Sequence, residues 1–372
     1  MSRRFAGQAR VVLAAVVLWP ATLAPDANAD APHTPAQFLG VAENGLAATQ
    51  RVFWNPQYHW YDWRVTKAAP PKPLASLWAV FPLFELVDAI AIASPTAAHK
   101  AAVEAIGRGA EAYLDPDTTP PAFTTHPGET NPAQHVYFDD NGWFEIAFLD
   151  AYQATRDQRF LDDAEEAYTF IAEQGWNSNG GGFWWETLHR HLTAEPLATE
   201  IDTGLRLYEI THQPSYLTSA EQWLAWANQS SWNASEQLYQ RNPTDGTTMD
   251  YVEGPMIGAD LELCAIRHVT GPCTAAESLA AASVATFGTD LDWTPAADAL
   301  YLRYMLQLYA TDHNVEWYDL AHRNAEDAIE NARDADGLFF KRWNGESFPI
   351  RLLQPDAATL SLFAWLAAFT HR

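Results

Sequence analysis

Asp150-Ala-Tyr-Gln-Ala-Thr155, followed by Arg159-Phe-Leu-Asp-Asp-Ala-Glu165, has a related copy 56 residues later in the chain. The second copy reads Arg206-Leu-Tyr-Glu-Ile-Thr211, followed by Ser215-Tyr-Leu-Thr-Ser-Ala-Glu221. A third, shorter copy starts at Gln307, which lies 101 residues after the second and so close to two further periods. The repeated unit is a pair of helical patterns of about 50 residues. Repeats of this kind form either an open solenoid or a closed toroid.

Apolar residues recur at i, i+3, i+4 and i+7 almost throughout, and the alternation of a half-buried strand is nowhere sustained for long. The pattern predicts an all-α fold with twelve helices, at residues 36–53, 74–92, 96–113, 140–155, 158–174, 195–211, 214–228, 255–269, 273–287, 296–311, 315–333 and 356–370. Twelve helices make six pairs, with single helices left at each end to meet. We therefore expect the array to close into a toroid.

The first 29 residues have the features of a secretory signal peptide. Basic residues precede the short apolar run Val11 to Trp19, and Ala27-Asn28-Ala29 fits a cleavage site. No later segment offers the roughly 20 apolar residues that a membrane-spanning helix needs. The sequence thus predicts a secreted protein without a membrane span, with a single domain over residues 30–372.

Charge and cysteine content narrow the possible partners. The net charge of −25 disfavours binding to nucleic acid or anionic lipid, but it does not exclude a neutral sugar. Cys264 and Cys273 are the only cysteines, and in an exported chain we expect them to form a disulfide. No histidine has metal-ligand spacing to another histidine or to these thiols, so we expect no metal and no other cofactor. The protein is expected to act as a monomer.

Long connections between the predicted helix pairs carry the unusual residues. They are 126–137, 177–185, 245–254 and 341–355. Loops on one rim of a rigid scaffold are where catalytic residues usually lie. We therefore expect any active site on that rim.

Two adjacent carboxylates, Asp139 and Asp140, stand where the helix predicted at 140–155 should begin. Successive Cα atoms lie about 3.8 Å apart, so these carboxyl groups can adopt the roughly 5 to 5.5 Å separation of retaining glycosidases. Two carboxylates this close cannot easily both ionise, so one can serve as acid and the other as nucleophile. Asp and Asn before an apolar run are also ordinary N-caps, and the residues alone leave both interpretations open.

Aromatic side chains provide a second candidate feature. The chain has 16 tryptophans, and a tryptophan face packs equally well on a sugar ring or inside a core. The run Gly180-Gly-Gly-Phe-Trp-Trp185 differs from the others, because three glycines indicate an exposed or tightly turned backbone. Trp184 or Trp185 could be presented to a ligand there.

Four segments together resemble glycoside hydrolase family 76 in their order and spacing. They are Tyr137-Phe-Asp-Asp-Asn-Gly-Trp143, Gly180-Gly-Gly-Phe-Trp-Trp185, Gly254-Pro-Met-Ile-Gly258 and Asn331-Ala-Arg-Asp-Ala-Asp-Gly-Leu338. The resemblance implies an (α/α)6 toroid and endo-acting hydrolysis of α-1,6-linked mannan with retention of configuration. It also implies that Asp139 is the nucleophile and Asp140 the general acid/base.

The chain departs from the family pattern around this pair. The family usually has Ala at Gly142 and Asn-Gln-Gly at 252–254, where Glu253 stands here. It commonly has two Asn where this chain has His191 and Glu195, and a Gln at Asp356. The residues expected to contact substrate are Asn141, Trp184, Trp185, His191, Glu195, Tyr251 and Glu253.

The predicted function is secreted, retaining hydrolysis of α-1,6-mannosidic linkages in mannan or a mannose-rich cell-wall glycan. Two alternatives stay open because of the departures. A transglycosylase would resolve the same covalent intermediate with a sugar acceptor. A catalytically inactive protein would only bind the glycan.

Overall fold

The computed structural model describes residues 32–65, 74–130 and 135–370. The predicted signal peptide at residues 1–29 lies outside the described residues. Among the described helices, none is both long and apolar enough to cross a bilayer.

Twelve α-helices occur in the described part of the chain, close to the predicted positions. They are α1 (Pro35–Phe53), α2 (Leu77–Ala93), α3 (Ala97–Ala110), α4 (Phe138–Thr155), α5 (Gln158–Phe170), α6 (Glu195–Thr211), α7 (Pro214–Ser230), α8 (Asp250–Arg267), α9 (Thr270–Phe287), α10 (Pro295–Asp312), α11 (Val315–Asp327) and α12 (Leu353–Thr370). The largest difference is at α11, which ends six residues before the prediction because a π-helical turn at Ala328–Ala332 follows it. α8 begins five residues before the prediction. Pro255 lies inside this helix and does not start it.

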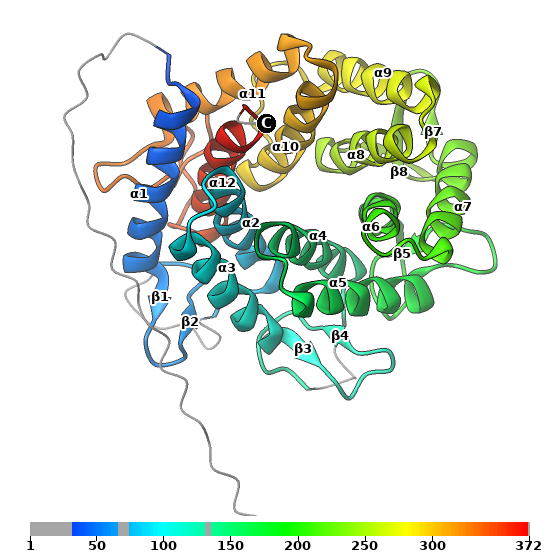
Figure 1. The fold of residues 1–372 in the computed structure, drawn as a ribbon, viewed down its shortest axis with the longest axis horizontal. Helices are drawn as coiled ribbons and strands as arrows, with labels where there is room; N and C mark the ends of the chain where they lie inside the picture. The colour runs from blue at the N-terminus through cyan, green and yellow to red at the C-terminus, as the bar shows by residue number, and fades with distance from the viewer. Residues whose placement is uncertain (1–31, 66–73, 131–134, 371–372) are drawn as a thin grey trace, which may run out of the picture.

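The even-numbered helices form an inner ring and the odd-numbered helices surround it (Figure 1). Each inner helix packs against the next, and α12 packs against both α10 and α2. The ring is therefore closed, as the six helix pairs predicted. α1 packs against α12, so the first and last helices complete the sixth pair.

Inner and outer helices differ in burial. Every residue of α12 from Pro355 to Phe369 is buried, because α1, α2, α10 and α11 surround this helix. The outer helix α5 buries one stripe, from Phe160 to Phe170, and exposes polar residues on its other side. An inner position thus explains why some helices lack a polar face.

The two rims of the toroid are unlike. Connections from each inner helix to the following outer helix are two or three residues long, at 94–96, 156–157, 212–213, 268–269 and 313–314. Connections from outer to inner helices are longer and carry all the short antiparallel strands of the described residues. These are β1 (Trp54–Asn55), β2 (Trp60–Tyr61), β3 (Leu114–Asp115), β4 (Ala122–Phe123), β5 (Phe183–Trp184), β6 (Leu192–Thr193), β7 (Trp232–Asn233), β8 (Leu238–Asn242) and β9 (Asp245–Thr248). The helical periodicity did not predict these strands, since they are too short to show alternation.

Cys264 near the end of α8 and Cys273 near the start of α9 are joined by a disulfide, with their Cα atoms 5.2 Å apart. The bond confirms the predicted pairing. The disulfide joins two residues that are only nine positions apart, so it constrains the short connection between α8 and α9.

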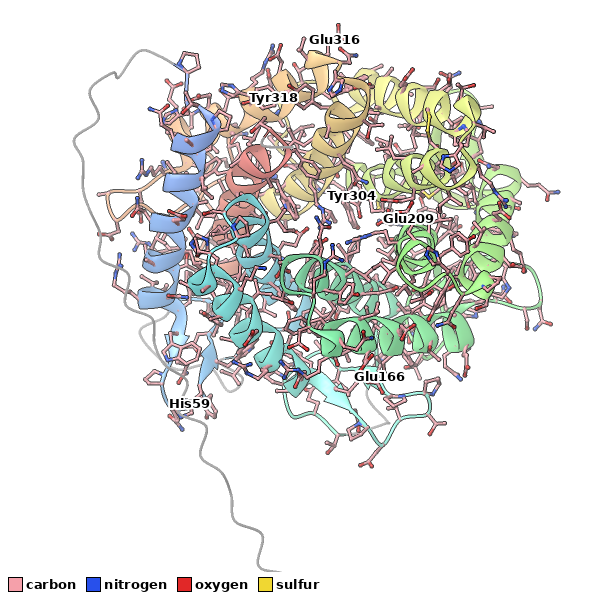
Figure 2. All side chains as sticks on the ribbon, in the orientation of Figure 1. His59, Glu166, Glu209, Tyr304, Glu316 and Tyr318 are labelled. Carbon is pink, nitrogen blue, oxygen red and sulfur yellow. A yellow bond between two sulfur atoms is a disulfide. The ribbon has the colours of Figure 1, made fainter. Side chains whose placement is uncertain are left out.

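Charged side chains fill the centre of the ring. Arg303 pairs with Glu85 at 2.6 Å and with Asp150 at 2.6 Å, and Arg206 also pairs with Asp150, at 2.7 Å. Tyr304 points inward with Glu209, whereas Glu166 and Glu316 lie on the outside of the toroid (Figure 2). The centre is thus held by ion pairs that close across four inner helices, α2, α4, α6 and α10.

Several carboxyl groups are buried between the inner helices, and the stability of the protein should therefore depend on pH. Burial raises the pKa of Glu145 to about 8 and that of Glu85 to about 7, although Arg303 opposes the shift at Glu85. Unfolded glutamates have a pKa near 4.3, so between about pH 4 and 8 the folded protein holds protons that the unfolded chain has released. The free energy of unfolding should consequently fall as pH rises through this window.

We expect the Tm at pH 5 to exceed the Tm at pH 8 by roughly 5 °C or more, as measured by calorimetry at constant ionic strength. Glu145→Gln, which is neutral at every pH, should reduce the difference. An equal or higher Tm at pH 8 would show that these carboxyl groups do not govern the pH dependence.

Candidate active site

The adjacent aspartates lie in the first turn of α4, on the rim with the long connections. α4 begins at Phe138 with Tyr137 as its N-cap residue, and no side chain caps this end. Asp139 and Asp140 are therefore the second and third residues of the helix, and the alternative that they are N-caps is wrong. Asp139 is partly exposed and Asp140 is 8% exposed. The helix N-terminus favours a negative charge at this position.

Trp185 is held directly beside Asp139. Its indole Nε1 donates a hydrogen bond to Asp139 Oδ2 at 2.9 Å. The backbone fixes this arrangement, because Phe138 N donates to Trp185 O at 2.9 Å and Thr187 N donates to Val136 O at 3.1 Å. Asp139 Oδ1 has no hydrogen-bond partner among the described residues. One oxygen of this carboxylate thus accepts the Trp185 hydrogen bond, and the other is buried without a hydrogen-bond partner in the described part of the chain.

The glycine run before Trp185 makes a tight turn, as the sequence indicated. Gly181 and Gly182 have φ values of 78° and 85°, in the region that favours glycine, and the Trp226 ring packs where their side chains would be. Trp184 stacks on His189, with ring centroids 5.4 Å apart. Of the two tryptophans expected near a ligand, the structure therefore brings only Trp185 to the aspartates.

Glu195, the first residue of α6, is a third carboxylate at the site. Its Oε1 accepts a hydrogen bond from Tyr251 Oη at 2.9 Å, and its Oε2 accepts one from the Thr193 hydroxyl. The side chain is 6% exposed, and its charge acts on Asp139. Glu195 and Tyr251, both predicted from the sequence, are thus brought together with the aspartates. The Trp185, Tyr251 and Thr193 groups that donate to Asp139 and Glu195 are neutral.

Burial and mutual repulsion shift the acidity of the aspartates. Burial raises the pKa of Asp140 to about 7. The pKa of Asp139 is raised well above its usual value by burial and then by the charges of Asp140 and Glu195, while the Trp185 hydrogen bond acts in the opposite direction. Because the two titrations belong to the pair, the pair retains a proton at near-neutral pH. A pair that holds one proton can supply an acid and a carboxylate together.

An aromatic cluster lies beside the carboxylates. Tyr251 packs against Trp143 at a centroid distance of 5.9 Å and against Trp293 at 5.2 Å, and Trp78 packs against Trp143 at 5.6 Å. Trp143 is buried, whereas Trp293 is 46% exposed. Trp293 was not among the residues predicted from the sequence, although it lies just before α10, on the rim with the long connections.

Two predicted substrate contacts are wrong in this structure. Asn141 is fully buried, where it accepts a hydrogen bond from Phe123 N and donates to the carbonyl oxygens of Phe123 and Tyr137. Glu253 is also fully buried, and its Oε1 accepts a hydrogen bond from Tyr239 N at 2.9 Å. Both side chains satisfy backbone groups of the rim connections, so their role is structural.

The other departures from the family pattern have different outcomes. The side chain of His191 is exposed, and its carbonyl oxygen accepts a hydrogen bond from Trp185 N at 2.8 Å, so its contact with substrate stays a prediction. Asp356 is fully buried and accepts hydrogen bonds from Thr49 Oγ1 at 2.6 Å and Phe339 N at 2.7 Å. A side chain at Gly142 would overlap Thr199 of α6, which explains the glycine at that position.

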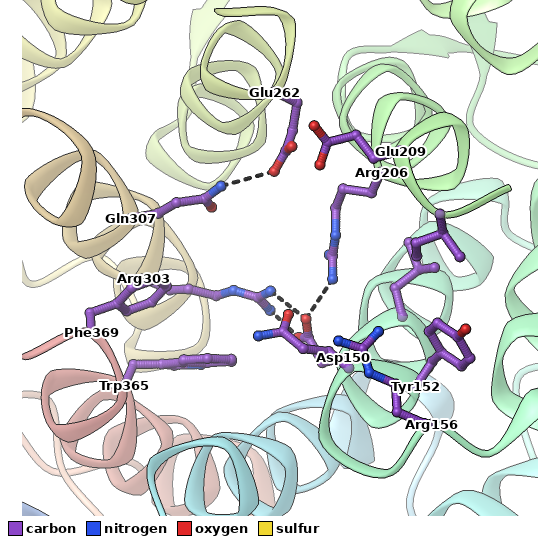
Figure 3. A pocket seen from close by; sticks show the side chains of 13 residues that line it. Asp150, Tyr152, Arg156, Arg206, Glu209, Glu262, Arg303, Gln307, Trp365 and Phe369 are labelled. Atoms are coloured by element: carbon purple, nitrogen blue, oxygen red, sulfur yellow. Dashed lines mark hydrogen bonds and ion pairs between the residues drawn. The ribbon is translucent and has the colours of Figure 1, made fainter. Parts of the chain in front are cut away.

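A cavity of about 480 Å³ lies at the opposite end of the inner helices (Figure 3). Asp150, Arg206, Arg303, Glu262 and Gln307 line it, and the first three form the central ion pairs. Asp150 is eleven residues after Asp139, so about 16 Å of helix separates the cavity from the aspartates. It is therefore not part of the candidate site. Among the described residues, no group of three or more His, Cys, Asp or Glu is placed to hold a metal ion.

Known proteins share this fold. A family 76 mannosidase from Bacteroides thetaiotaomicron VPI-5482 superposes with a TM-score of 0.81 at 15% identity, over 90% of this chain and 99% of that one. A family 76 α-mannanase from Bacteroides thetaiotaomicron gives 0.81 at 19% identity, over 90% and 96%. The α-1,6-mannanase of Salegentibacter sp. HEL1_6 gives 0.74 at 20% identity, over 89% and 99%. A further structure holds an inactive variant of that enzyme, with two consecutive aspartates changed to asparagine, in complex with α-1,6-mannotriose.

Sequence comparison matches part of the chain to one protein family. No curated protein matches the chain. Residues 125–287, which contain the adjacent aspartates, the glycine turn, Glu195 and Tyr251, match the model of glycosyl hydrolase family 76. This match and the shared toroid agree with the motifs of the sequence, and they identify residues 125–287 as a region of glycoside hydrolase family 76.

Proposed function

We propose that this glycoside hydrolase is a secreted, retaining enzyme that cleaves α-1,6-mannosidic linkages within mannan. The carrying observation is the pair Asp139 and Asp140 in the first turn of α4, with Trp185 fixed on one oxygen of Asp139. The fold is shared with α-mannanases, one of which is an α-1,6-mannanase, and this supports the choice of substrate.

The first step uses the two aspartates together. Asp140, whose pKa is raised by burial, donates its proton to the glycosidic oxygen, and the Asp139 carboxylate attacks the anomeric carbon from the opposite face. The bond from the anomeric carbon to the leaving oxygen breaks as the bond to Asp139 forms. The shortened chain leaves as an alcohol, and a mannosyl ester of Asp139 remains. The Trp185 hydrogen bond to Oδ2 orients the carboxylate for this attack.

The second step reverses the roles of the groups. Asp140 is now a carboxylate and takes a proton from a water molecule, whose oxygen attacks the anomeric carbon. The ester bond breaks, Asp139 regains its negative charge, and Asp140 regains its proton. Two inversions at one carbon give net retention. Glu195 keeps its neutral donors Tyr251 and Thr193 throughout and takes no proton in this scheme.

Incubation with linear α-1,6-mannan tests the proposal. We expect a ladder of manno-oligosaccharides by chromatography, because an endo-acting enzyme cleaves within the chain. Proton NMR during the first minutes should show the α-anomer as the initial product. A β-anomer would exclude retention, products longer than the substrate would indicate transglycosylation, and binding without any product would indicate an inactive glycan-binding protein.

Secretion is part of the same proposal. It is supported by the signal-like pattern of residues 1–29 and by the disulfide between Cys264 and Cys273, which is typical of exported proteins. N-terminal sequencing of protein recovered from the culture medium should begin at Asp30. Retention of the full-length chain inside the cell would argue against export.

A further inference from the structure

We infer that Trp293 and Tyr251 form a sugar-stacking subsite, one that binds a mannosyl unit of the chain remote from the bond being cleaved. This inference rests on the proposed function. It assigns a binding role to Trp293, which lies outside the motifs of the sequence, and it makes the preferred substrate a chain of several sugars.

The first support is that Tyr251 and Trp293 are linked to the aspartates by a series of interactions. Glu195, whose charge acts on Asp139, accepts the hydrogen bond of Tyr251 Oη, and the Tyr251 ring packs against Trp293 at 5.2 Å with an interplanar angle of 51°. A charge interaction, a hydrogen bond and a ring contact thus link the reacting carboxylate to an exposed indole. A chain that passes the aspartates along this line meets Tyr251 and then Trp293.

The second support is that Trp293 is exposed to solvent while its backbone is held in place. Trp293 is 46% exposed, yet its backbone is held, because Arg342 donates from Nη1 to the carbonyl oxygens of Asp292 and Trp293. Asn344 Nδ2 also donates to Asp292 Oδ2 at 2.8 Å. The connection between α9 and α10 is therefore braced by residues 342–344. A large aromatic face that is fixed in place and still open to solvent loses little freedom on binding.

Position on the rim is the third support. Trp185 is 40% exposed and precedes α6, whereas Trp293 precedes α10, two inner helices further around the ring. Trp185 contacts Asp139 directly, whereas Trp293 is linked to it only through Tyr251 and the charge of Glu195. Trp185 therefore belongs to the bond-cleaving position, and Trp293 belongs to a more distant one.

Kinetics with substrates of different length test the inference. Trp293→Ala should lower kcat/KM for α-1,6-mannan about tenfold, the loss of one aromatic contact. An activated aryl α-mannoside occupies only the bond-cleaving position, and its kcat/KM should change by less than about twofold. Trp293→Phe, which keeps a flat ring, should recover most of the activity on mannan.

Trp232→Ala is the matched control. Trp232 is 37% exposed and packs against Tyr239 at a centroid distance of 5.0 Å, but within the described part of the chain no contact links it to the aspartates. This variant should leave both substrates unaffected. No loss on mannan in Trp293→Ala, or an equal loss on both substrates, would overturn the inference.

Binding separates this inference from the proposed function. In an Asp139→Asn background, titration calorimetry with α-1,6-mannotetraose should give a Kd about tenfold weaker after Trp293→Ala. This result would support the subsite even if the protein proved not to hydrolyse mannan. An unchanged Kd would overturn the subsite and leave hydrolysis at the aspartates untouched.

Discussion

Asp139→Asn is expected to lower kcat on α-1,6-mannan by at least about a thousandfold while the protein stays folded. The amide oxygen of asparagine can still accept the hydrogen bond from Trp185 Nε1, so the local structure should persist. The amide is not a competent nucleophile, however, and no ester can form. Initial-rate measurements on mannan, with thermal unfolding as a check of the fold, would give the effect.

Asp356→Asn provides a matched control, because Asp356 also lies in the first turn of an inner helix but binds Thr49 and Phe339 away from the aspartates. This variant should lose some stability and keep its kcat. Near-native hydrolysis by Asp139→Asn would show that Asp139 is not the nucleophile. A sharper result comes from Asp139→Ala with added azide, where attack from the vacated face should give the β-mannosyl azide.

Asp140→Asn is expected to lower kcat/KM on mannan by about a thousandfold and on an aryl mannoside with a good leaving group by about tenfold or less. The alcohol that leaves from mannan needs a proton, whereas an acidic phenol leaves without one. Because kcat/KM reports the step that forms the ester, the comparison isolates protonation. An equal loss on both substrates would show that Asp140 is not the acid.

The pH profile of the same variant gives an independent readout. Burial raises the pKa of Asp140 to about 7, and the pair must hold one proton to act, so the native enzyme should lose activity on mannan as rising pH removes that proton. Asp140→Asn should lack this alkaline limb. With azide, Asp140→Ala should give the α-mannosyl azide, since azide would attack the ester of Asp139. If Asp139→Ala gives the β-mannosyl azide and Asp140→Ala gives the α-mannosyl azide, Asp139 is the nucleophile and Asp140 is the acid/base.

Local periodicity alone determined the helices of this protein and their pairing. The spacing of apolar residues reports one face of each helix, and the 56-residue repeat reports the helix pair, so twelve helices and a closed ring followed from the sequence. The pairing of Cys264 with Cys273 was equally local. The sequence also predicted that Asp139 and Asp140 lie at the start of a helix, but it did not determine whether they are N-cap residues. Capping depends on where the helix begins, and a shift of two residues placed them inside the first turn.

Tertiary structure alone decided which polar and aromatic residues meet. Trp185 reaches Asp139 across 46 residues, and Tyr251 reaches Glu195 across 56, because backbone hydrogen bonds and ring closure bring their connections together. Asn141 and Glu253 resemble substrate ligands in the sequence, yet they are buried against backbone groups. A polar side chain looks the same in a sequence whether it satisfies a buried N–H or faces solvent. The physical reason is that the spacing of apolar residues reports only which face of a helix is buried. A contact between two distant loops depends on the closed ring of helices, which brings the loops together.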